Sequence, residues 1–218
     1  MPGNGLEIIE RVRSQTNRFL TWLGIRQKPP IEGFATLAGF IHGNAAFVSQ
    51  VTLYTYIKTR AGTQYPKLFE NETYLTSLRM ARWHIYGASV ADLALFAVAR
   101  LFRDGAVSKA GAAVLAEALM RDILLAVDQQ DIAADAFHAM LEEGCRRAAF
   151  GQWGHWAEAG NAFTPSADAL MRWAPIADEL KALDEEILRN SIHLRWIGVR
   201  RELIERLAPD RFNPAHGG

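Results

Sequence analysis

The chain has 218 residues, of which 50% are hydrophobic and 22% charged, and its 24 basic and 24 acidic side chains leave no formal net charge. These values exclude a disordered or low-complexity protein, because such chains are poor in apolar residues. They also argue against a nucleic-acid-binding protein that depends on an overall basic charge. A single cysteine, Cys145, excludes an intramolecular disulfide and fits a reducing compartment. Glu7 and Glu10 interrupt the apolar stretch that a secretory signal needs, so we expect a cytoplasmic protein.

Apolar residues recur with a helical period along almost the whole chain. The pattern predicts helices over 6–23, 33–61, 73–103, 109–128 and 132–150, and a long last helix from Thr164 to Leu207 with a kink at Pro175. Ser108 is expected to cap the helix over 109–128. Irregular structure is expected over 62–72 and 151–166, and a flexible tail over 208–218. With no strand alternation and no long linker, the sequence predicts a mainly α protein: one domain over 1–207, folded as a bundle of about six helices.

Two apolar runs are long enough to suggest membrane spans. The first, from Phe34 to Ile57, carries no charged side chain but has His42, Asn44 and Gln50 near its middle. The second, from Trp83 to Ala99, contains an aspartate. Polar side chains at the centre of a bilayer are costly, so we interpret both runs as helices buried within a soluble bundle.

Common catalytic and cofactor motifs are missing from the sequence. His138 and Glu142 lie one helical turn apart, as do His155 and Glu158, but two ligands do not complete a metal site. Neither a phosphate-binding glycine loop nor a dinucleotide fingerprint occurs. We therefore expect no metal and no cofactor, and we favour a non-enzyme while leaving catalysis open.

Polar residues inside the apolar helices are the most informative feature. Asp92 is the only acidic residue between Glu72 and Asp104, and a carboxylate in such a setting needs a partner or a proton. Several polar or charged side chains lie within the predicted apolar helices and are the candidate ligand-binding residues: Gln50, Tyr54, Arg60, Arg82, His84 and Asp92. If their helix faces meet, the side chains form either a polar cluster that fixes the helix register or a pocket for a small or lipidic ligand.

Two segments are candidates for docking. Residues 6–28 combine an apolar stripe with a basic face, which suits a partner groove or an anionic membrane surface. The last helix carries an apolar stripe of Leu180, Leu183, Ile187 and Leu194. Residues 1–104 carry an excess of positive charge and residues 105–218 an equal excess of negative charge.

The sequence favours a non-catalytic adaptor, regulatory or assembly protein that acts through protein–protein contacts. Its partner would be another protein or a second copy of the chain, and no nucleic acid is expected. The alternative is a helical-bundle enzyme or carrier that holds a small or lipidic ligand between the helices over 33–61 and 73–103.

Overall fold

The computed structural model describes residues 28–158 and 160–215. Contacts divide the chain into two compact units, 1–30 and 31–218, and the second unit contains the helices that the structure describes. Its elements are the helices α2 (Phe34–Ala61), α3 (Tyr65–Leu68), α4 (Glu72–Arg103), α5 (Lys109–Leu125), α6 (Ala134–Phe150), α7 (Trp153–Glu158), α8 (Thr164–Trp173) and α9 (Asp178–Arg206), with short 3-10 turns at Gly62–Gln64, Gly160–Phe163 and Pro209–Arg211. The mainly α helical bundle is confirmed. The helix predicted over 6–23 lies outside the described residues, so a single domain reaching back to residue 1 stays a prediction.

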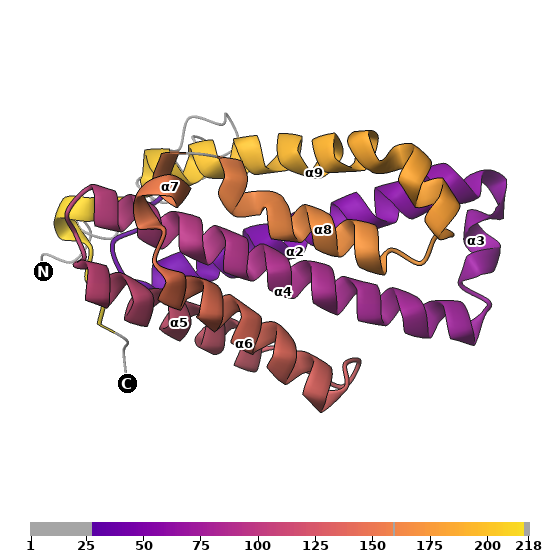
Figure 1. Cartoon of the computed structure of the whole chain (residues 1–218), viewed down its shortest axis with the longest axis horizontal. Helices are drawn as coiled ribbons and strands as arrows, with labels where there is room; N and C mark the ends of the chain where they lie inside the picture. Colours follow the sequence, from indigo (N-terminus) through magenta and orange to yellow (C-terminus); the bar gives the residue numbers. More distant parts are fainter. Residues whose placement is uncertain (1–27, 159, 216–218) are drawn as a thin grey trace, which may run out of the picture. The chain divides into compact units, whose positions relative to one another are not determined.

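Helix α4 is the central element of this unit. It packs against α2, α5, α6, α7 and α8 (Figure 1). Between residues 85 and 101, every position except Ala88 and Arg100 is buried. A helix that is apolar on nearly all sides is stable in water only when neighbours cover it, and α4 therefore forms the core around which the other helices are arranged.

The predicted helix ends agree with the structure where a capping residue or a turn defines them. The Ser108 side chain accepts a hydrogen bond from the Gly111 amide at 3.1 Å, as expected for the start of α5. At the start of α4, the Asn71 side chain accepts from the Tyr74 amide at 3.0 Å. Both caps satisfy amide groups that the first helical turn leaves unpaired.

The prediction of one kinked helix over 164–207 is wrong. The chain forms two helices there, α8 and α9, because Ala174 leaves the helical region (φ −55°, ψ 128°) directly before Pro175. Proline disfavours the helical conformation of the residue before it and lacks the amide that would continue the hydrogen bonding. The helix therefore ends and a new one begins at Asp178.

The two segments predicted as irregular also contain short helices. Helix α7 lies within 151–166, and two tryptophans fix it, since Trp153 and Trp156 are both buried in the core. Helix α3 lies within 62–72 and has a proline in its first turn. These helices are too short to show an apolar periodicity, which explains the wrong prediction.

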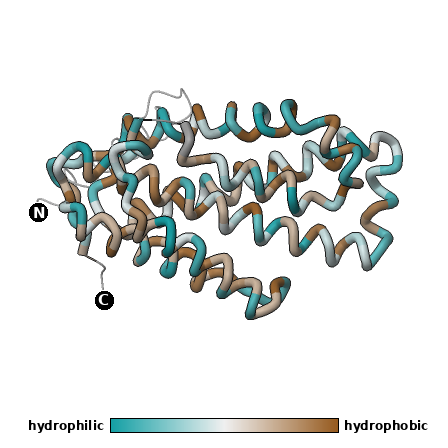
Figure 2. Tube along the Cα trace, viewed as in Figure 1, coloured by the Kyte–Doolittle hydropathy of each residue, from teal (hydrophilic) through white to brown (hydrophobic). Residues whose placement is uncertain are grey.

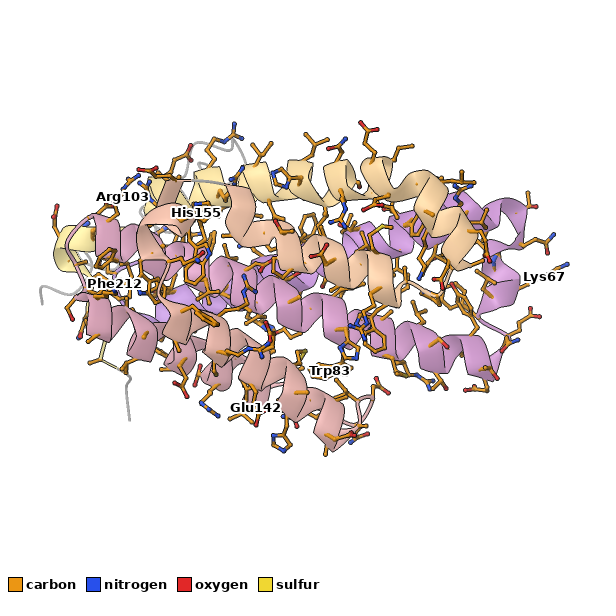
Figure 3. All side chains as sticks on the ribbon, viewed as in Figure 1. Lys67, Trp83, Arg103, Glu142, His155 and Phe212 are labelled. Carbon is orange, nitrogen blue, oxygen red and sulfur yellow. The ribbon has the colours of Figure 1, made fainter. Side chains whose placement is uncertain are left out.

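The chain entering α2 pairs with the chain leaving α9. The Ile31 amide donates to the Arg206 carbonyl at 2.7 Å, and the Asn213 amide donates to the Glu32 carbonyl at 2.8 Å. Phe212 is buried in the core, at the end of the bundle that also holds His155 (Figure 3). Residues 208–213, which we expected at the start of a flexible tail, are thus tied to the bundle.

Among the described residues, α4 is the one helix long and apolar enough to cross a membrane. Of its most apolar window, 83% is buried inside the bundle. The core helix of a soluble protein passes the same test, so this finding carries no conclusion about a membrane.

Candidate functional site

Asp92 lies in the core and is fully buried. Its Oδ2 accepts a hydrogen bond from the Ser166 amide at 2.8 Å. Its Oδ1 lies 2.8 Å from Nη2 of Arg147 on α6, in an ion pair whose geometry leaves that oxygen without a hydrogen bond. The cationic partner of Asp92 is thus Arg147, which is not among the candidate residues of the sequence analysis.

A hydrogen-bonded network extends from this carboxylate. The Ser166 hydroxyl accepts a hydrogen bond from Trp196 Nε1 at 3.0 Å and donates to the Phe163 carbonyl at 3.0 Å. Arg147 also donates to the Ala162 carbonyl at 3.2 Å. The network joins α4, α6, α8 and α9 in the interior.

Opposing influences set the acidity of Asp92. Burial raises its pKa to about 6, because a charged carboxylate loses its hydration in the core. The Arg147 charge and the hydrogen bond from Ser166 act in the opposite direction and limit the rise. The arrangement favours the register-fixing interpretation of Asp92, since all of its contacts are to neighbouring helices.

The structure brings only Gln50 and Arg82 of the six candidates together. They line a cavity of about 240 Å³ between α2, α4 and the chain linking α5 to α6. The same cavity holds a pair that we had not included among the candidates: Nδ1 of His42 lies 2.8 Å from the Tyr86 hydroxyl. Burial raises the pKa of Tyr86. Ser49, Asp128 and Asp131 are the other polar residues of the lining.

Apart from Asp92, the remaining candidates lie at three other places. Arg60 forms a close ion pair with Asp184 of α9 and thereby lowers the pKa of that carboxyl. The His84 ring stacks on Trp173 of α8, with 3.6 Å between centroids and 5° between planes. Tyr54 is half-buried and packs against the core. The six residues therefore do not form one polar cluster.

Helix α9 has two apolar faces. Its inner face is buried against the bundle: Leu188, Ile192, Trp196, Val199 and Leu203. Its outer face carries large aliphatic side chains that remain exposed: Leu180, Leu183, Ile187, Leu194, Ile197 and Ile204. In Figure 2, brown hydrophobic segments alternate with teal hydrophilic ones along α9. The stripe noted in the sequence is this outer face.

The described residues contain no group of three or more histidine, cysteine or acidic side chains placed to hold a metal ion. Comparison with known proteins adds no assignment: no family model, no curated protein and no solved structure matches this chain.

Proposed function

We propose that this protein is a non-catalytic assembly protein that pairs with a second copy of itself through the outer face of α9. The observation that carries the proposal is the exposure of this face. Leu183, Ile187 and Leu194 are 79%, 70% and 68% exposed. Burial of these side chains by a partner would stabilise the complex, because it removes apolar surface from water.

The spacing of the outer face supports a helical partner. Positions 180, 183, 187, 190, 194, 197, 201 and 204 follow one another at alternating intervals of three and four residues, which is the heptad repeat of helices that pack along a common seam. Asn190 and Arg201 are the polar members of this series.

The charges of α9 favour a second copy in the antiparallel orientation. Residues 178–192 carry five carboxylates and two cationic side chains, whereas residues 193–206 carry four arginines and two carboxylates. An antiparallel pair places the acidic half of one helix against the basic half of the other, and a parallel pair places like charges together. When the two helices overlap over their full length, Ile187 faces Ile197 and Leu183 faces Arg201 of the second copy.

Light scattering after size-exclusion chromatography tests the proposal. We expect the wild-type chain to have the mass of a dimer and Ile187→Glu the mass of a monomer, because a carboxylate in the seam cannot be buried without a partner. Val114→Glu on α5 is the matched control, since Val114 is also 70% exposed, and it should remain dimeric. A monomeric wild-type chain at high micromolar concentration, or equal effects of both substitutions, would overturn the proposal.

Disulfide cross-linking tests the orientation. In a Cys145→Ala background, chains carrying Leu183→Cys are mixed with chains carrying Arg201→Cys and then oxidised. An antiparallel pair gives a cross-link between the two different chains, whereas a parallel pair links each chain to its own kind. Predominant like-with-like cross-linking would refute the antiparallel arrangement.

A second candidate function is the binding of a small molecule between α2 and α4. The observation that favours it is the cavity lined by Gln50 and Arg82 together with the His42–Tyr86 pair. Native mass spectrometry of the purified chain measures a bound molecule directly, and Arg82→Gln should reduce its occupancy. Peripheral binding of residues 6–28 to anionic membranes and a cytoplasmic location remain predictions from the sequence.

A further inference from the structure

Several arginines gather around a groove that the C-terminal end of α4 and α9 line together. The groove, of about 610 Å³, is lined by four arginines: Arg100, Arg103, Arg200 and Arg201. Two carboxylates, Glu158 and Glu205, lie on the same lining. Arg103 marks this end of α4 in Figure 3.

The carboxylates near the groove neutralise its arginines only weakly. Arg201 lies 4.0 Å from Glu205, and both side chains are mostly exposed. Asp104 follows α4 and serves two arginines, at 3.2 Å from Arg103 and 3.9 Å from Arg100. Arg103 Nε donates a hydrogen bond to Asp104 at that distance, but long or exposed ion pairs contribute little attraction in water.

The surroundings of Arg100 and Arg200 destabilise their charged side chains. The Arg100 side chain is 13% exposed, and its Nε is buried without a hydrogen-bond partner. Arg200 places its guanidinium 5.6 Å from the centre of the Phe163 ring and forms no ion pair with a described residue. Burial lowers the pKa of both groups. A buried cation is stable only when a counter-charge accompanies it.

The rest of the groove is apolar. Phe96 and Ala157 are buried beneath it, and Ile197 and Ile204 contribute exposed aliphatic surface. An inorganic ion would satisfy the guanidinium groups but leave this surface uncovered. A ligand with both an acidic group and a hydrocarbon part matches both features.

We propose that this groove binds an organic anion, with a carboxylate or phosphate group held by Arg100, Arg103 and Arg200 and an apolar body placed on Phe96, Ile197 and Ile204. Guanidinium groups suit this role, because their planar N–H donors pair with two oxygens of one anion. Ile197 and Ile204 also belong to the outer face of α9, so the ligand and a second copy would share this surface. The three arginines that hold the anion lie outside the series of seam positions.

Isothermal titration at low ionic strength tests the inference with sodium octanoate, octyl phosphate, 1-octanol and sodium phosphate. We expect one octanoate or octyl phosphate per chain, bound at least tenfold more tightly than octanol or inorganic phosphate. Equal affinities of octanoate and octanol would refute the role of the arginines. Equal affinities of octanoate and inorganic phosphate would refute the role of the apolar surface.

Variants locate the binding site. Arg200→Gln and Arg103→Gln should each weaken octanoate binding at least tenfold, whereas Arg121→Gln on α5 should leave it unchanged. Arg103 and Arg121 are matched, because their side chains are 40% and 49% exposed and each contacts one carboxylate. Arg103→Gln remains informative if Arg200→Gln unfolds. Unchanged binding in Arg103→Gln, or equal losses in Arg103→Gln and Arg121→Gln, would overturn the assignment.

The titration is repeated with Ile187→Glu. Retained binding in that variant is expected, and it separates the anion site from self-association. Loss of binding in this variant alone would show that the site requires the second copy and would overturn its assignment to a single chain.

Discussion

Asp92 caps a helix to which it does not belong. Its carboxylate accepts the amide of Ser166, the third residue of α8, at 2.8 Å. Phe163, which precedes α8, offers no capping side chain. The first amides of a helix lack partners within the helix, and a negative charge at that end is favourable. The only acid in a long apolar stretch of sequence thus completes the start of a helix that follows much later in the chain.

Removing this carboxylate should destabilise the fold strongly. In Asp92→Ala, Arg147 loses its buried counter-charge and the Ser166 amide loses its acceptor. We expect the free energy of unfolding to fall by about 3–5 kcal/mol, the range found when one member of a buried ion pair is removed. Urea titration followed by circular dichroism measures the change. Asp92→Asn keeps an acceptor for Ser166 and should cost less; equal losses in both variants would contradict the capping role.

Asp92 should also make stability depend on pH. Its folded pKa of about 6 lies above the value of 3.8 that is usual for an exposed aspartate, so the folded state binds the proton more tightly than the unfolded state. The resulting stabilisation is fully present below pH 3.8 and is lost as the pH rises through about 6. Two pKa units correspond to about 3 kcal/mol. The stability of wild type relative to Asp92→Asn should therefore decline by about this amount between pH 4 and pH 7. A flat difference would show that the Arg147 charge and the Ser166 hydrogen bond cancel the effect of burial on the Asp92 pKa.

His84 should contribute a pH dependence of the opposite sign. Burial, and then the nearby Arg172 charge, lowers the pKa of His84 below 6.5. The neutral ring that stacks on Trp173 is therefore favoured above pH 6.5, and its stabilisation is lost as the pH falls through the folded pKa. His84→Phe keeps a flat ring on Trp173 and removes the titration. Its stability relative to wild type should rise on acidification from pH 7 to pH 5, as measured by thermal unfolding; a constant difference would argue against the buried neutral ring.

The sequence could predict the helices whose ends are marked locally. Ser108 marks the start of α5, because its side chain caps the helix. Gly62 marks the end of α2, because it adopts a positive φ. It could also identify Asp92 as buried, because one acid among apolar residues needs a partner. The partner itself could not be predicted, since Arg147 is distant in sequence and only the packing of α6 on α4 brings it near.

The stripes of α9 show a second limit of sequence reasoning. Leu183, Ile187 and Leu194 form a regular apolar series, yet they face outward, while Trp196 and Ile192 on the opposite side enter the core. A helix with two apolar faces gives no internal indication of which face is covered by the same chain. The six candidate residues were separated for the same reason, because the rotation of each helix about its axis depends on neighbours.

Close packing between α4 and α6 depends on Gly87. A Cβ atom at this position would overlap the Sδ, Cε and Cγ atoms of Met140. Because Cγ is near the backbone, Met140 cannot avoid the overlap by moving only its end. Gly87→Ala should therefore reduce the free energy of unfolding by about 1–3 kcal/mol, the usual cost of overpacking. This loss outweighs the gain of about 1 kcal/mol that alanine normally brings to a helix.

Met140→Ala provides the test of this cause. In a Met140→Ala background, the space beside Gly87 is open, and Gly87→Ala should then stabilise the protein through helix propensity alone. A double-mutant cycle in urea measures the coupling between the two positions, which we expect to exceed about 1 kcal/mol for residues in contact. Additive effects would mean that the helices can separate enough to accept the methyl group, and that Gly87 does not control the distance between α4 and α6.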